Sequence, residues 1–107
     1  MAEWKNNNRK IDADLSSIAS MFETQKVKRM YDISELFPTK ISRLLGVNTD
    51  RYSVKLSNPE KFSVAEILKL AYILGISPNL IFDIIQKETE IRIIEKIKLN
   101  AGKYGLL

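Results

Sequence analysis

A short polar run, from Asn48 to Lys55, gathers hydrogen-bonding side chains between two apolar segments. It reads Asn-Thr-Asp-Arg-Tyr-Ser-Val-Lys and so combines amide, carboxylate, guanidinium, hydroxyl and ammonium groups. If the run is helical, Tyr52 and Leu56 lie one turn apart on its inner side, and most of the polar groups turn outward. Such a face is suited to directional hydrogen bonds with a charged, polar partner.

The residue types that carry most catalysis and metal binding are missing. The chain has no histidine and no cysteine, which removes the usual base at neutral pH, the thiolate nucleophile and the common zinc ligands. Asp12-Ala13-Asp14 could in principle hold Mg²⁺, but helix capping explains the pair without a metal. We therefore expect no enzymatic activity and no cofactor.

Basic charge is concentrated in the middle of the chain. Seventeen Lys and Arg against thirteen Asp and Glu give a net charge of +4, and residues 24–61 hold the whole excess. A polyanion would therefore meet this middle segment first. The 107 residues fit a single domain. We expect a flexible polar tail over residues 1–11, no secretory signal, no membrane span and a cytoplasmic protein.

Hydrophobic periodicity predicts helices from about residue 12 onward. Ile11, Leu15, Ile18 and Phe22 form one stripe, and residues 26–37 also fit a helix. Further helices are expected over residues 38–45, 49–57 and 64–74 and from residue 78. Their start and stop signals are Pro38, Gly46, Asn48 or Thr49, the capping box Ser63 to Glu66, and Ser77-Pro78. No convincing strand pattern occurs, so the predicted fold class is an all-α bundle of five to six helices.

Two short helices joined by Gly46-Val47-Asn48 fit a helix-turn-helix. The segment FPTKISRLLGVNTDRYSVKL, followed by SVAEILKLAYILGISPNLI, resembles the phage-repressor and Cro-like, lambda-repressor-like helix-turn-helix domains. Ser42 stands where that family usually has a small residue, and Leu45-Gly46-Val47 matches its turn. The run from Lys55 to Ser63, with Asn48, is similar to a phage-associated branch. The resemblance covers residues 30–85, the expected core, and leaves residues 86–107 as a helical extension.

The resemblance implies a DNA-binding transcriptional regulator that places the helix around residues 48–56 in the major groove. Affinity would come mainly from basic contacts with phosphate, and specificity from the first turns of that helix. The expected DNA-binding residues are Thr39, Lys40, Arg43, Asn48, Thr49, Asp50, Arg51, Ser53, Lys55 and Lys61.

Two departures from the family pattern support an alternative. Pro38 stands where many members have a phosphate-binding glutamine, and Asp50 directs a negative charge toward the groove. The alternative is a protein-interaction module that kept this scaffold without binding DNA. The isoleucines from Ile91 onward need a cover in either case. They could fold back on the stripe that contains Leu15, or pair with a second subunit in a homodimer, which would suit a palindromic site.

Overall fold

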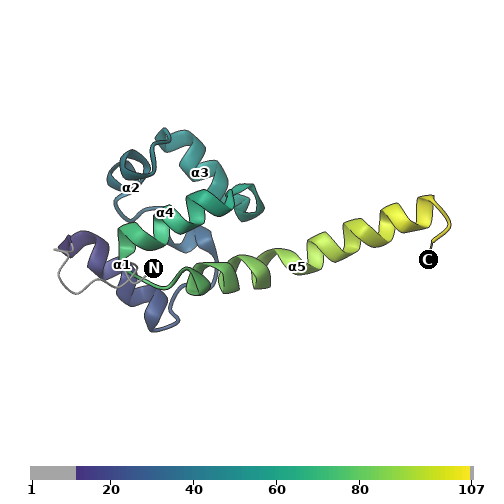
Figure 1. The fold of residues 1–107 in the computed structure, drawn as a ribbon, viewed down its shortest axis with the longest axis horizontal. Coiled ribbons are helices and arrows are strands. Elements are labelled where there is room, and N and C mark those ends of the chain that lie inside the picture. Colours follow the sequence, from purple (N-terminus) through teal and green to yellow (C-terminus); the bar gives the residue numbers. More distant parts are fainter. Residues whose placement is uncertain (1–11, 107) are drawn as a thin grey trace.

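The computed structural model describes residues 12–106 of the chain (Figure 1). Residues 1–11, for which the sequence predicts a flexible tail, and Leu107 lie outside the described part. The elements are α1 (Ala13–Glu23), the 3-10 helix η2 (Met30–Ile33), α2 (Pro38–Leu45), α3 (Thr49–Ser57), the 3-10 helix η3 (Pro59–Lys61), α4 (Val64–Leu74) and α5 (Pro78–Lys103). No strand occurs between residues 12 and 106, so the prediction of an all-α fold is confirmed.

The helices begin and end where the local chemistry predicts. Asp12, rather than Asp14, caps α1 by accepting a hydrogen bond from the Asp14 amide at 2.8 Å. Ser63 and Glu66 form a reciprocal capping box at the start of α4, with bonds of 3.0 and 2.9 Å. Gly46 ends α2 with a φ of +80°, a left-handed conformation that glycine adopts without steric cost.

The prediction of a helix over residues 26–37 is wrong. Within this range only Met30–Ile33 is helical, and it forms a single 3-10 turn. The Asp32 carboxylate accepts hydrogen bonds from the amides of Lys28 and Arg29, at 2.9 and 3.0 Å. These bonds hold Arg29 in an extended conformation and satisfy amides that a helix would have used. The side chain of Asp32 thus competes with the helical backbone.

One apolar core holds the helices together, and α4 lies at its centre. It packs against α1, α2 and α5, and its residues Leu70, Ala71 and Leu74 are buried. Val64 and Tyr72 are exposed, so one side of α4 remains open to solvent. Because α2 and α3 share this core, their relative position is fixed by packing.

Helix α5 is continuous and far longer than the others (Figure 1). Its first half packs on the body, where Ile81 is fully buried and the Glu88 carboxylate accepts from the Met30 amide at 3.0 Å. Its second half projects away, which gives the described residues extents of 55 × 29 × 24 Å. The expected extension therefore continues the helix that begins at Pro78, and its isoleucines do not fold back on α1. No described helix combines the length and apolarity that a membrane crossing requires.

Candidate nucleic-acid interface

The turn between α2 and α3 is short and held by backbone hydrogen bonds. The amides of Gly46 and Val47 donate to the carbonyls of Arg43 and Ser42, at 3.2 and 3.0 Å. Ser42 is buried, and its hydroxyl lies 3.3 Å from the hydroxyl of Thr49 at the start of α3. A small side chain at position 42 therefore lets the two helices approach closely.

Helix α3 has one apolar side and one polar side. Tyr52 and Leu56 are almost completely buried against the body, whereas Asp50, Arg51 and Val54 are exposed. The distribution follows the helical spacing that the sequence predicted. The outer side of α3 is therefore available to an external partner.

The start of α3 offers backbone donors as well as side chains. Asn48 caps the helix, with its side-chain oxygen accepting from the Arg51 amide at 2.8 Å. Thr49 and Ser53 are exposed near the flanks of the polar side. The remaining first-turn amides and the positive end of the helix dipole favour an anion at this place.

A shallow hollow of about 430 Å³ lies beside the polar side of α3. Its lining combines residues of α3 with Lys61 of η3, which the turn at Asn58-Pro59 brings back toward the helix. The structure thereby brings together six residues, five of which were predicted as site residues: Asn48, Asp50, Arg51, Val54, Lys55 and Lys61.

The expected basic residues divide into two groups. Within residues 12–106, Arg43, Arg51 and Lys61 are exposed and form no ion pair with a carboxylate. Lys55 is different, because its ammonium lies 2.9 Å from a Glu66 carboxylate oxygen and donates to the Lys61 carbonyl at 3.2 Å. Both side chains of the Lys55–Glu66 pair are largely buried, at 20% and 16% exposure.

The environment of Glu66 favours its ionised form. Burial opposes ionisation, but the hydrogen bond from the Ser63 amide and the contact with Lys55 outweigh it, and the pKa of Glu66 lies below its ordinary value of 4.5. At neutral pH the carboxylate therefore neutralises Lys55 on the side of the hollow.

Lys40 is the second internally paired cation. Its ammonium lies 2.9 Å from an Asp12 oxygen and 2.8 Å from an Asp14 oxygen, and so it ties α2 to α1. Hydrogen bonds to these two carboxylates raise the pKa of Lys40, and the bond from Lys40 lowers the pKa of Asp12. The two carboxylates considered for Mg²⁺ thus hold a lysine, and no metal-binding group of three or more acidic side chains occurs among the described residues.

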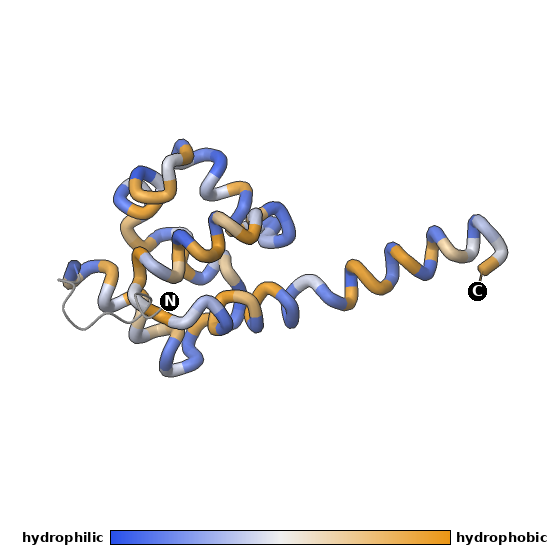
Figure 2. The backbone as a smooth tube through the Cα atoms, viewed as in Figure 1, coloured by the Kyte–Doolittle hydropathy of each residue, from blue (hydrophilic) through white to orange (hydrophobic). Residues whose placement is uncertain are grey.

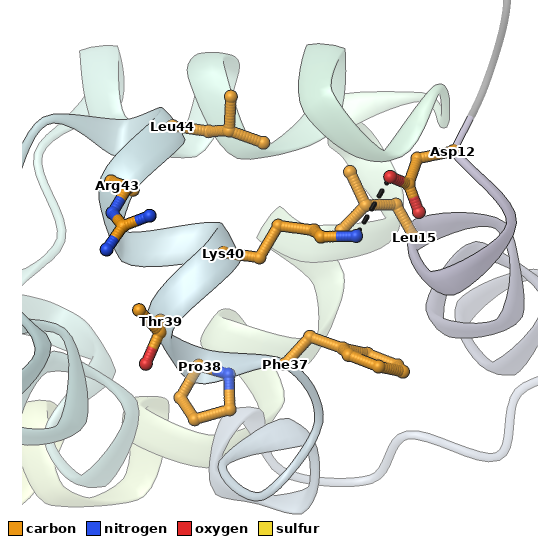
Figure 3. Close-up of a pocket in the computed structure, with 8 residues that line it drawn as sticks. All are labelled: Asp12, Leu15, Phe37, Pro38, Thr39, Lys40, Arg43 and Leu44. Carbon is orange, nitrogen blue, oxygen red and sulfur yellow. Dashed lines mark hydrogen bonds and ion pairs between the residues drawn. The ribbon is translucent and has the colours of Figure 1, made fainter.

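A second open hollow, of about 680 Å³, lies beside the start of α2 (Figure 3). Lys40 and Phe37 point toward α1 there, and Thr39 and Arg43 line the same hollow. Phe37 is held at a φ of +51°, and the Lys40 ammonium lies 5.8 Å from the centre of its ring. Of the three α2 residues expected to contact DNA, Thr39 and Arg43 are exposed, and Lys40 is held by α1.

Sequence reasoning missed the pairing of Lys40 and Lys55 with carboxylates. Glu66 lies eleven positions from Lys55, and Asp12 lies twenty-eight positions from Lys40. Neither spacing places the partners on one helix face, so only the tertiary fold brings them together.

No protein-family model, curated protein or solved structure matches this chain. The resemblance to phage-repressor domains therefore stays a prediction that depends on the residues of the chain itself.

Proposed function

We propose that this protein binds double-stranded DNA as a transcriptional regulator of phage-repressor type, with α3 in the major groove. The observation that carries the proposal is the division of α3 into a buried side, Tyr52 and Leu56, and an exposed polar side that begins at the helix N-terminus. A recognition helix needs both sides, because one anchors it and the other meets base edges.

The exposed residues have complementary roles in this proposal. Arg51 donates to a base edge, most favourably to guanine, and Asp50 accepts from a cytosine amino group. Val54, which is 47% exposed, contacts a thymine methyl. The backbone amides at the start of α3 meet one phosphate.

The flanking basic residues supply sequence-independent affinity. Arg43 on α2 and Lys61 on η3 are unpaired with carboxylates in the described chain and lie on either side of α3 along the sequence. We assign both to the phosphate backbone, with Thr39 as a hydroxyl donor. Lys40 and Lys55 contribute less, because carboxylates already hold them.

A specific observation favours a second candidate function. Two of the five basic residues expected at the interface are neutralised internally, which lowers the attraction for a polyanion. A protein-interaction module on the same scaffold would need no such attraction. In that case α3 would contact one protein partner and no duplex would bind.

The deciding experiment selects duplexes from random DNA and compares two variants on the selected site. Arg51→Ala removes the central donor and should weaken binding roughly 5- to 150-fold, the range for one good base contact of about 1–3 kcal/mol. Lys96→Ala removes an equal charge from the exposed far part of α5 and should have little effect. Both variants should keep the melting temperature.

Two results would reject DNA binding. The first is an equal effect of Arg51→Ala and Lys96→Ala on affinity. The second is an absence of duplex binding even at low salt, together with co-purification of one stoichiometric protein, which would select the interaction module.

A further inference from the structure

One ion pair joins α5 to η3 where α5 leaves the body (Figure 1). The Arg92 guanidinium lies 2.7 Å from a Glu60 carboxylate oxygen. From Ile91 to Asn100 every residue of α5 is exposed, and Figure 2 shows apolar and polar residues alternating along this projecting part. Arg92 thus ties the beginning of the projecting part to the body.

Arg92 lies on the side of α5 that faces the body. Thr89 is buried on this side, and Arg92 follows it by three residues, which places the two on one line of the helix. Ile94 and Ile97 lie roughly 140–200° around the helix from Arg92. They belong to the apolar face of α5, which is directed away from the body and is exposed. Because η3 packs against α5 on the body side, Glu60 lies within reach of Arg92.

Helix η3 carries two opposite charges that serve different neighbours. Glu60 and Lys61 are successive residues of η3. Lys61 lines the hollow beside α3, and its carbonyl accepts from the Lys55 ammonium at 3.2 Å. The Glu60 carboxylate is instead directed to α5 by its pair with Arg92. Helix η3 therefore connects α5 with the polar side of α3.

An unpaired carboxylate on η3 would oppose the binding of a phosphate at Lys61. The Cα atoms of successive residues lie about 3.8 Å apart. A free Glu60 carboxylate and a phosphate bound at Lys61 would therefore be separated by roughly one Debye length, about 10 Å at about 0.1 M salt, and would still repel each other. Arg92 cancels the charge of Glu60 and leaves the charge of Lys61 as the net charge of η3.

We propose that Arg92 is a positioning residue of the nucleic-acid interface, which holds and neutralises Glu60 so that Lys61 attracts a phosphate. The inference rests on the proposed binding of DNA through α3, and Arg92 itself contacts no phosphate. An exposed ion pair contributes little to stability, and both side chains of this pair are exposed, at 54% and 37%. The pair therefore acts through the charge that η3 presents to the duplex.

Three variants with controlled net charge test the proposal. Arg92→Ala and Lys96→Ala each lower the net charge from +4 to +3 on the same helix, and the double variant Glu60→Gln with Arg92→Ala returns it to +4. Fluorescence anisotropy measures their affinity for the selected duplex. Arg92→Ala should weaken binding roughly two- to eightfold at about 0.1 M salt, where eightfold is the loss of one whole phosphate contact. Lys96→Ala should have little effect, and the double variant should bind within about twofold of wild type.

The salt dependence separates this role of Arg92 from two simpler ones. If Arg92 bound a phosphate directly, the double variant would keep a slope of log affinity against log salt that is shallower than the wild-type slope by about 0.9. If the ion pair only held η3 in place, the double variant would bind as weakly as Arg92→Ala. Neutralisation of Glu60 predicts instead that the double variant recovers both the affinity and the slope of wild type. Helical circular dichroism should be the same for all chains.

Two results would overturn the proposal while the proposed function stands. The first is an equal affinity of Arg92→Ala and Lys96→Ala, and the second is a double variant that does not recover from the loss caused by Arg92→Ala. Failure of the proposed function gives a different result, because wild type would then bind no duplex even at low salt. That result would reject DNA binding and, with it, this role of Arg92.

Discussion

The ion pair between Glu66 and Lys55 predicts that a single charge-removing substitution has opposite effects on stability and on DNA binding. Glu66→Gln keeps an acceptor for the Ser63 amide, which lies 2.9 Å from the Glu66 oxygen, but removes the charge that holds Lys55 at 2.9 Å. Replacing a charge-assisted hydrogen bond by a neutral one lowers the free energy of unfolding by about 1 kcal/mol. Urea unfolding measures this loss.

The same substitution releases a cation beside α3. Lys55 lines the hollow with Arg51 and Lys61, so its freed ammonium lies close to the proposed phosphate path. One added phosphate contact makes the slope of log affinity against log salt more negative by about 0.9, and affinity rises most at low salt. Fluorescence anisotropy with a labelled duplex measures both quantities.

The control is Glu95→Gln, which changes the net charge equally at an exposed position on the projecting half of α5. If Glu66→Gln and Glu95→Gln had the same affinity and the same salt slope, Lys55 would lie away from the duplex and the placement of the interface would be wrong. A stability unchanged from wild type would show that the ion pair contributes nothing.

Three further predictions concern stability. Tyr52→Phe should raise the free energy of unfolding, measured by urea denaturation, by about 1 kcal/mol. The Tyr52 hydroxyl is buried, which raises its pKa, and it has no hydrogen-bond partner among the described residues. A fall in the free energy of unfolding by more than about 1 kcal/mol would contradict this prediction. Gly46→Ala should lower the free energy of unfolding by about 1–2 kcal/mol in the same assay, because alanine is strained at a φ of +80°. The added Cβ would meet no atom within 4 Å, so this loss would come from the backbone alone. An unchanged free energy of unfolding would refute the strain. Acid should destabilise the protein as pH falls below about 4.5. The carboxyl groups of Glu66 and Asp32 have folded-state pKa values below their ordinary 4.5 and 3.8, so they take up protons when the protein unfolds. A melting temperature that stays constant from about pH 6 to about pH 3 would contradict this prediction.

The local features of this fold could be predicted from the sequence. Pro38 begins α2, Gly46 ends it, and Ser63 with Glu66 begins α4, because each signal acts through backbone groups within a few residues. The outward direction of Asp50 and Arg51 followed equally from the helical period. These features depend on no distant contact.

The features that sequence reasoning missed depend on side chains far apart in the chain or on competition for backbone donors. Residues 26–37 have the apolar spacing of a helix, but the Asp32 carboxylate binds the amides that a helix would need. The sequence suggested that Lys40 and Lys55 are free cations, and only the tertiary fold brings carboxylates at the start of α1 and on α4 to them. The direction of the apolar face of α5 likewise depends on which side of that helix the body occupies.

The salt dependence of duplex binding tests the central claim most directly. Three basic residues of the interface, Arg43, Arg51 and Lys61, are exposed and unpaired within the described chain. If each displaces one counterion from a phosphate, log affinity should fall against log salt with a slope of roughly −3 for each bound subunit. Arg51→Ala should reduce the steepness of that slope by about 0.9. An affinity that stays flat between about 50 and about 200 mM salt would contradict the placement of α3 against DNA.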